Sequence, residues 1–308
     1  FTRALKQCGY LGVDEPFDGL FTQGMVCHET YRDAEGGWVF PDDVRSDTRP
    51  DSVGGYVRAD TGQPITVGRS EKMSKSRRNV VDPEAILDAY GADAGRLFMM
   101  SDSPPDRDLE WTEAGIDGAW RYINRLWRLV TDAVDALPPV GSEKGRDISA
   151  ADLESLRVMH KTIDAVTTDL DRFRFNRAVA RVRELTNLLS ADVAHPWVLR
   201  FGLETLVQLI GPMLPHIAEE LWRRLGHETL LADTPWPSAD PALLADDTVT
   251  LAVQVKGKLR GTIEMPLNSD NAAVERAALA LDGVQRITGG AAPRKVIVIP
   301  NKVVNVVI

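Results

Sequence analysis

KMSKSRRNVVDPEAILDAYGADAGRLFMMS, residues 72–101, contains the strongest structural signals in this chain. Asp82-Pro83 is a favourable helix start, because Asp accepts hydrogen bonds from free N–H groups and Pro has no N–H that needs a partner. The helix is predicted to end at Gly91, since glycine readily takes the left-handed conformation of a C-cap. A second helix, capped by Asp93, is predicted to come next. The basic, turn-like stretch RSEKMSKSRRN, residues 69–79, comes before the first helix.

That loop carries two lysines and two hydroxyls within five residues, Lys72, Ser74, Lys75 and Ser76. Ammonium and hydroxyl groups can surround a polyphosphate, and preorganised cations stabilise the charge that develops on a leaving pyrophosphate. The alternative is a solvated basic loop. Two lysines at this spacing are by themselves compatible with both interpretations.

Both parts of the stretch resemble one family. Residues 72–76 resemble the KMSKS motif of class I aminoacyl-tRNA synthetases, and residues 80–101 resemble the segment after that motif in the subgroup for Leu, Ile, Val and Met. The resemblance implies that residues 1–100 are the end of a Rossmann-type catalytic domain, that Lys75 binds the ATP phosphates, and that Mg²⁺ accompanies ATP. It assigns to the same catalytic loop Lys72, Ser74 and Ser76.

Short elements flank this stretch on both sides. Residues 1–8 read as the end of a helix, since their apolar side chains recur at helical spacing. Gly55 to Val67 is predicted to be a pair of short strands around a turn at Asp60-Thr61-Gly62. Residues 101–115 are predicted to be a connecting loop without regular elements, because they are rich in prolines and acidic residues.

Residues 116–237 have the period of amphipathic helices. We expect four of them, starting near Ile116, Leu153, Phe175 and Pro196, with the last one reaching Leu225 and Pro212 and Pro215 bending or starting it. Four such helices with short joints predict an antiparallel bundle. Within it, LIGPMLPHIAEELW resembles a helix of the anticodon-binding domain in the same synthetase subgroup.

The period changes in residues 248–308. Val249 to Val255 alternates like a strand with one buried face, Lys256-Gly257 suits a two-residue hairpin turn, and residues 259–265 return. A helix from Asp270 to Leu281, capped by Asp270 or Ser269, and two further strands complete a small ββαββ domain. The chain as a whole is therefore predicted to be an α+β multidomain protein.

Charge is distributed unevenly along the chain. The net charge is −9, yet residues 249–308 contain eight Lys and Arg and only four Asp and Glu. A phosphate-bearing partner could meet this basic tail while the acidic remainder keeps the protein soluble. A patch of this size is equally compatible with ordinary solvated surface.

Leucine is the amino acid that the resemblance favours within the subgroup. LFTQGMV before the loop, EWTEAGIDGAWRYINRLWRLV after it, and VQVKGKLRGTIEMP with RKVIVIPNKVVNVVI in the tail resemble the leucyl enzymes of bacteria. The family has an Asn where Lys256 stands, which adds a charge here and weakens the left-handed preference of the turn. The implied reaction activates leucine with ATP to leucyl-adenylate and esterifies it to tRNA(Leu).

The resemblance also ranks the basic residues that could meet tRNA. In leucyl enzymes the bundle contacts the tRNA body and the C-terminal domain meets its outer corner. Arg174, Arg177 and Arg181 are predicted to project from one helix face, where phosphate contact and a solvated face are both open. Candidates in the C-terminal domain are Lys256, Lys258, Arg260, Arg294, Lys295 and Lys302.

Metal sites are not expected. His216 has no second ligand at a useful spacing, so a packed or capping histidine is the better interpretation, and the adjacent Cys27 and His28 do not make a zinc site either. The absence of a zinc-binding Cys cluster after the bundle argues against an isoleucyl enzyme. No metal ligand is therefore assigned in this chain.

Alternatives remain open. The chain could belong to an isoleucyl, valyl or methionyl enzyme, or be a tRNA-binding module without catalysis, although such a module has no use for an ATP loop. A HIGH-like motif and an editing domain are absent from these 308 residues, so we expect a truncated part of the enzyme that is inactive alone. Two cysteines and no apolar run of about 20 residues lead us to expect a cytoplasmic protein without membrane contact.

Overall fold

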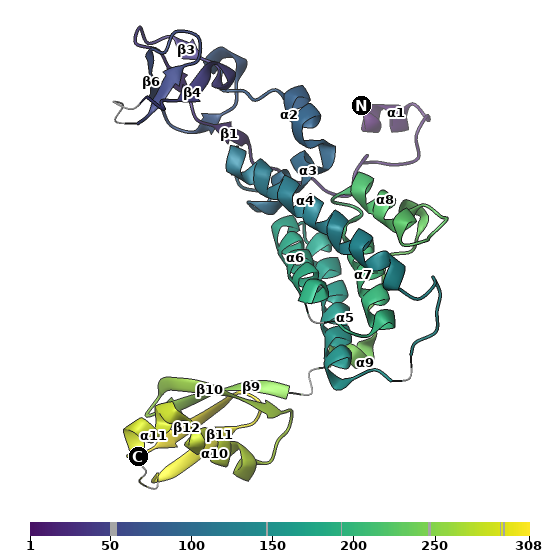
Figure 1. The fold of residues 1–308 in the computed structure, drawn as a ribbon, viewed down its shortest axis with the longest axis vertical. Helices are drawn as coiled ribbons and strands as arrows, with labels where there is room; N and C mark the ends of the chain where they lie inside the picture. The colour runs from purple at the N-terminus through teal and green to yellow at the C-terminus, as the bar shows by residue number, and fades with distance from the viewer. Residues whose placement is uncertain (50–53, 146, 192, 246–247, 290, 292) are drawn as a thin grey trace. The chain divides into compact units, whose positions relative to one another are not determined.

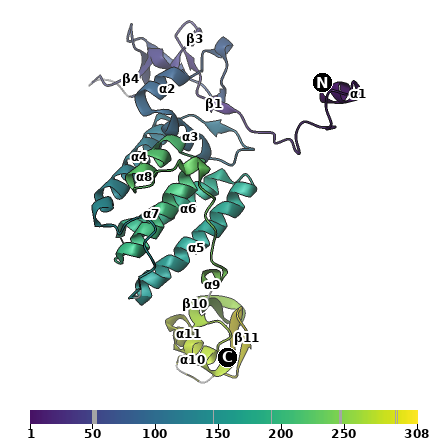
Figure 2. The same cartoon turned by 90° about the vertical axis from the view of Figure 1, so that its right-hand side faces the viewer.

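The computed structural model describes residues 1–49, 54–145, 147–191, 193–245, 248–289, 291 and 293–308. Contacts between Cα atoms divide the chain into two compact units, Phe1–Ala239 and Asp240–Ile308. Figures 1 and 2 show the first unit as small sheets followed by packed helices, and the second as a sheet with two short helices. The contacts do not separate residues 1–100 from residues 116–237.

A three-stranded sheet joins segments that are distant in sequence. Its order is β7-β1-β8, formed by Glu71–Lys72, Val26–His28 and Leu109–Glu110. β1 runs antiparallel to β7 and parallel to β8. The prediction that residues 101–115 hold no regular element is therefore wrong at Leu109–Glu110. A two-residue strand has no periodicity of its own, and only its partner β1 defines it.

A five-stranded antiparallel sheet of order β3-β2-β6-β5-β4 lies between β1 and β7 in the sequence. β5, Tyr56–Arg58, and β6, Pro64–Val67, pair as predicted, with Gly62 in the left-handed conformation at φ 70°. Buried Tyr31, Val39 and Ile65 form its core. The other strands of this sheet are β2 (Tyr31–Arg32), β3 (Trp38–Val39) and β4 (Val44–Ser46), and the 3₁₀ turn η1 (Pro41–Asp43) precedes β4. The helix α1 (Thr2–Gln7) lies before β1 in the sequence.

The two helices after the basic loop form where the sequence places them. α2 spans Pro83–Tyr90, and Asp82 Oδ1 accepts a hydrogen bond from the N–H of Glu84 at 3.0 Å. α3 spans Ala92–Ser101 with Gly91 as its N-cap. The prediction that Asp93 caps this helix is wrong: Asp93 lies inside its first turn, and its carboxylate accepts hydrogen bonds from the start of a different helix.

Where four bundle helices were predicted, the described residues between 113 and 224 form five. They are α4 (Glu113–Ala133), α5 (Ala150–Asp171), α6 (Phe175–Ala191), α7 (Pro196–Ile210) and α8 (Pro215–Arg224), with 3₁₀ turns η3 (Val134–Ala136) and η4 (Leu231–Asp233). The single helix predicted from Pro196 to Leu225 is wrong, because the chain turns at residues 211–214. Pro212 and Pro215 each lack an N–H and clash with the carbonyl four residues earlier, so the helix stops and restarts at Pro215.

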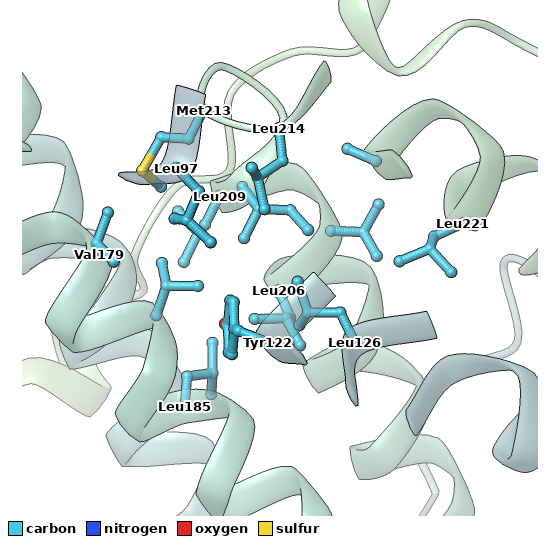
Figure 3. Packing of buried hydrophobic residues seen from close by; sticks show 14 of the residues in the cluster. Leu97, Tyr122, Leu126, Val179, Leu185, Leu206, Leu209, Met213, Leu214 and Leu221 are labelled. Carbon is cyan, nitrogen blue, oxygen red and sulfur yellow. The ribbon is translucent and has the colours of Figure 1, made fainter. Parts of the chain in front are cut away.

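One hydrophobic core runs through these helices. Leu126, Met159, Leu206 and Leu209 have at most 1% of their surface exposed, and Leu97 of α3 belongs to the same cluster. Figure 3 shows Leu97 beside Met213 and Leu209. α5 and α6 are joined by three residues and pack along each other, and α7 lies against both (Figure 2). The helices after the basic loop are thus built into the core of the bundle.

The second unit has the sheet order β10-β9-β12-β11. The Lys256-Gly257 turn is confirmed, with both residues left-handed at φ 48° and 76°. The ββαββ pattern needs one correction, since a second helix comes after the first. The elements are α9 (Pro241–Leu244), β9 (Thr248–Val255), β10 (Lys258–Pro266), α10 (Asn271–Ala280), α11 (Asp282–Thr288), β11 (Lys295–Ile299) and β12 (Val303–Val307).

The extra helix has a local cause. Leu281 is extended at φ −64° and ψ 128°, which interrupts the helical path between α10 and α11. Gly283 then passes so close to β10 that a Cβ would lie 2.2 Å from the carbonyl oxygen of Arg260. Asp270 is the N-cap residue of α10, as predicted, but its side chain makes no capping hydrogen bond.

Candidate functional site

The loop of residues 72–79 is anchored on β1. Lys72 pairs with Cys27 across the sheet, and the N–H of Met73 donates to the carbonyl of Val26 at 3.0 Å. Beyond this point the chain leaves the sheet and forms a single 3₁₀ turn, η2, at Lys75–Arg77. A rigid strand therefore ends directly at the first lysine of the loop.

The two loop hydroxyls shape the turn. Ser74 is its N-cap, and its Oγ accepts a hydrogen bond from the N–H of Arg77 at 3.3 Å. Ser76 Oγ lies 3.2 Å from Ser74 Oγ. Arg78 ends the turn in the left-handed conformation at φ 53°. The structure thus brings the two serines together and directs the backbone back toward the sheet.

Asn79 fastens this loop, and sequence reasoning missed it. The residue is fully buried, and its Oδ1 accepts from the N–H of Ser74 at 2.9 Å. Its Nδ2 lies within hydrogen-bond distance of the carbonyl oxygens of Glu71 at 3.0 Å and His28 at 3.2 Å. A carboxamide offers a donor and an acceptor from one group, which is what the loop base requires. The only signal in the sequence was an Asn at the end of a basic loop.

The cations of the loop fall into two kinds. Arg77 forms an ion pair with Glu71, and the Arg78 guanidinium lies over the Phe40 ring at 5.2 Å. Lys72 and Lys75 are exposed, and neither has an ion-pair partner among the described residues. Two ammonium groups thus stay available for an anion while the neighbouring guanidinium groups are held by the protein.

An apolar cavity of about 550 Å³ opens beside the loop. Met73 lines it from the loop, Ile86 and Leu87 from α2, Met99 from α3, and Trp111 from the segment after β8. The same helices that extend the bundle core therefore form the wall behind the basic loop.

The Cys27–His28 pair shows no sign of special reactivity. Burial raises the pKa of the Cys27 thiol, which disfavours the nucleophilic thiolate. The ring Nδ1 of His28 lies 2.9 Å from the carbonyl oxygen of Glu29. Over the part of the chain that the structure describes, no three His, Cys, Asp or Glu residues are grouped as a metal site.

His216 contacts a carboxylate from α3. Its Nδ1 lies 2.9 Å from Asp93 Oδ1, and the N–H of Ile217 donates to Asp93 Oδ2 at 2.8 Å. Asp93 thereby caps the N-terminus of α8 from α3, where a negative charge also complements the helix dipole. This tertiary cap links the segment after the basic loop to the bundle.

The three arginines predicted on one helix face have different surroundings. Arg181 donates from Nε to Asp169 Oδ2 at 2.7 Å, and the Asp169 side chain is only 4% exposed. Arg174 precedes α6 and lies in the α5–α6 joint, so it is not part of the helix face. Arg177 is exposed in the first turn of α6. The structure brings Arg174 and Arg177 together at one cavity and pairs Arg181 with α5.

The sheet of the second unit gathers most of the basic candidates at one end. Lys256 lies in the β9–β10 turn, Lys258 pairs with Val255, and Lys295 pairs with Val307, next to that turn. Arg260 occupies a bulge of β10. All six candidates are exposed: Lys256, Lys258, Arg260, Arg294, Lys295 and Lys302. Lys302, in the β11–β12 turn, lies at the opposite end of the sheet.

Asn305 of β12 holds the basic turn in place, and no pattern in the sequence pointed to it. Its Oδ1 accepts from the N–H of Gly257 at 3.2 Å, and the N–H of Lys256 donates to the carbonyl of Val306 at 3.1 Å. The left-handed conformation of Lys256 is thus compensated by hydrogen bonds to a neighbouring strand.

No described helix is both long enough and apolar enough to span a membrane.

Comparisons with known proteins cover both units. Residues 55–112 match the family model of class I tRNA synthetases (I, L, M and V), and residues 152–276 match that of the anticodon-binding domain of tRNA ligase. Leucine–tRNA ligases of Paramagnetospirillum magneticum and Rhodospirillum rubrum are 58% and 55% identical to this chain over its full length.

A solved structure is similar as well. It is the ternary complex of the Agrobacterium radiobacter K84 agnB2 LeuRS with tRNA and LeuAMS, with a TM-score of 0.70 and 29% identity over 99% of this chain. The chain spans about a third of the length of these relatives: 35% of the P. magneticum protein, 36% of the R. rubrum protein and 35% of the A. radiobacter chain.

Proposed function

Because this chain belongs to the leucine–tRNA ligases of class I, we propose that it is the part of such an enzyme that supplies one ATP-binding loop and the surfaces that hold tRNA(Leu). In that reaction ATP and leucine give leucyl-adenylate and pyrophosphate, and leucine then passes to the tRNA. The observation that carries the proposal is the loop of residues 72–79. It presents two exposed lysines, and the buried Asn79 side chain holds its backbone in place.

The loop would act on the triphosphate of ATP. Lys75 and Lys72 would neutralise charge on the β- and γ-phosphates as the bond to the α-phosphorus breaks and pyrophosphate leaves. Ser74 and Ser76 would order the turn and offer hydroxyl donors. Mg²⁺ would enter bound to ATP as part of the substrate.

The tRNA would be held away from this loop. Arg174 and Arg177 of the bundle, together with the basic end of the second unit, would contact phosphates and fix the register of the tRNA. Arg181, already paired with Asp169, would contribute less, because its charge is partly neutralised. The anticodon-binding match over residues 152–276 supports a tRNA-binding role for this part of the chain.

Amino-acid-dependent ATP–pyrophosphate exchange by the whole protein that carries this chain tests the proposal. Exchange should depend on leucine and respond far less to isoleucine, valine or methionine at equal concentration. Preferential exchange with one of the other three amino acids would identify a different member of the subgroup. Absence of exchange with all four, combined with tight tRNA binding, would instead identify a tRNA-binding module without catalysis.

A further inference from the structure

The joint between α5 and α6 contains an unusual backbone conformation. Phe173 is left-handed at φ 55°, and 49% of its surface is exposed. The left-handed conformation is rare for a bulky residue and costs on the order of 1 kcal/mol or more. Glycine and asparagine adopt it more readily. The joint is nevertheless well fixed, since the N–H of Arg174 donates to the carbonyl of Asp169 at 2.7 Å. A strained and fixed aromatic side chain is thus held out toward solvent.

A second exposed aromatic meets it from a distant part of the chain. The rings of Phe21 and Phe173 are stacked, with centroids 5.1 Å apart and an angle of 15° between the planes. The rings of Phe173 and Phe175 form a T-shaped pair, with centroids 5.8 Å apart. Phe21 is 45% exposed, so the pair presents aromatic surface to solvent. Such a surface can bind a flat aromatic ligand by stacking.

Four arginines surround these rings. Together with Phe21 and Phe173 they line a cavity of about 390 Å³, within the range of about 300–1,000 Å³ typical of small-ligand sites. Asp106 is the single carboxylate among the described residues of the lining. The arginines are Arg107, Arg172, Arg174 and Arg177, and none of their guanidinium groups has a hydrogen-bond or ion-pair partner within the described part of the chain.

The backbone at Arg107, which lies outside the joint, packs closely against another segment of the chain. Gly24 donates to the carbonyl of Pro105 at 2.9 Å and passes so close to Arg107 that a Cβ would lie 1.9 Å from its carbonyl oxygen. This contact fixes the Arg107 segment beside the stretch of chain that carries Phe21 into the cavity. Arg181, on the same helix as Arg177, is paired with Asp169 and does not line this cavity.

We infer that this cavity binds one unstacked nucleotide of an RNA, with its base against Phe173 and its phosphate among the arginines. Stacking of a base on an aromatic ring contributes about 1–3 kcal/mol, and guanidinium groups bind phosphate oxygens in a bidentate way. The inference rests on the proposed function in one respect, namely that the RNA is tRNA(Leu). It adds a specific site for a single nucleotide, to which residues from three separate segments contribute.

Variants of Phe173 in the whole protein test the stacking. The probe is a fluorescently labelled tRNA(Leu) transcript, with anisotropy measured against protein concentration. Phe173→Leu keeps apolar volume but removes the ring, and the free energy of stacking corresponds to a loss of roughly 5- to 150-fold in affinity. Phe173→Trp keeps a ring and should bind within about twofold of wild type. Trp120→Leu, an exposed aromatic on α4, is the matched control and should bind like wild type.

Salt dependence tests the phosphate part. Arg172→Gln and Arg177→Gln should each reduce the slope of log affinity against log salt by about 0.7–0.9, whereas Phe173→Leu should leave the slope unchanged. Arg128→Gln, an exposed arginine on α4, controls for the change in net charge. Equal slopes for all three arginine variants and wild type would overturn the phosphate contact.

Three further outcomes have distinct meanings. Wild-type affinity in Phe173→Leu would overturn the nucleotide site but leave tRNA binding intact. If Phe173→Leu and Phe173→Trp both lose affinity and both unfold at lower temperature than wild type, the ring serves packing against protein, and the inference is wrong. A wild-type protein that does not bind tRNA(Leu) would contradict the proposed function and the inference together.

Discussion

Asp93 in α3 accepts a hydrogen bond at 2.8 Å from the backbone N–H of Ile217 in α8, so a side chain from one helix caps another helix 124 residues away in sequence. Asp93→Ala should lower the free energy of unfolding by about 1–2 kcal/mol, the cost of losing an N-cap carboxylate. Asp93→Asn retains an acceptor and should lose less. Urea unfolding measures both variants, with the exposed Asp88→Ala on α2 as control. An Asp93→Ala variant as stable as wild type would show that the cap contributes nothing.

Asn79 should set the shape of the basic loop. Asn79→Asp keeps an acceptor for the N–H of Ser74 but replaces the donor with a charge that faces the carbonyls of Glu71 and His28. We expect a loss of stability of about 1–3 kcal/mol, the cost of leaving buried polar groups unsatisfied. Leucine-dependent ATP–pyrophosphate exchange should fall as well, measured at a temperature where the variant remains folded. Unchanged exchange in a stable variant would mean that the loop does not need this anchor.

Lys75 should act in the chemical step. Lys75→Ala should slow ATP–pyrophosphate exchange by roughly 10²–10³, the scale for removing one preorganised electrostatic contact. Affinity for leucine should change little, because an ammonium at the phosphates does not contact the amino acid. The exposed Lys144→Ala serves as control. Wild-type exchange by the Lys75 variant would remove Lys75 from the mechanism.

The basic end of the second unit should contribute to tRNA binding and not to activation. Neutralising Lys258 and Arg260 together should reduce the salt slope of tRNA affinity by about 0.7–0.9 for each phosphate that the variant can no longer neutralise. Exchange without tRNA should remain unchanged. Arg276→Gln with Arg286→Gln makes the same charge change on α10 and α11 and separates position from net charge. Identical slopes for both double variants would indicate ordinary surface charge.

Asp152 should make the free energy of unfolding depend on pH in the acidic range. Its pKa is lowered from 3.8, first by the Ser149 hydroxyl, which donates at 2.6 Å, and then by the N–H groups of His195 and Ala194. A carboxyl whose pKa is lowered by folding stabilises the protein above its unfolded pKa, and this contribution is lost as pH falls through the folded pKa. Wild type should therefore be more stable than Asp152→Asn at neutral pH, and the difference should shrink below about pH 4. Urea unfolding at several pH values measures it; a difference independent of pH would contradict this assignment.

Local features of the sequence predicted local structure well. Asp82 caps α2, Gly62 turns the β5–β6 pair, and Lys256-Gly257 closes the hairpin, because each depends on a few neighbouring residues. The motif of residues 72–76 likewise identified the candidate loop. These features lie within one element or one turn.

Tertiary partners were not predictable. Asp93 and Asn79 looked like a helix cap and a loop residue, yet each satisfies backbone groups that only the folded chain brings near. Arg181 looked free on a helix face, and Asp169 on another helix neutralises it. A sequence contains the donors and acceptors, but it does not state which of them meet.

The strand order β10-β9-β12-β11 has a consequence for biosynthesis. β12 is the last of these strands to leave the ribosome, yet it lies in the middle of the sheet, parallel to β9 and antiparallel to β11. The β9–β10 hairpin can form while the chain is still growing. During that interval the inner edge of β9 is an unpaired template for foreign strands, a known route to aggregation. Because the chain is synthesised from its N-terminus, this edge of β9 stays unpaired until Val303–Val307 emerges and pairs with it.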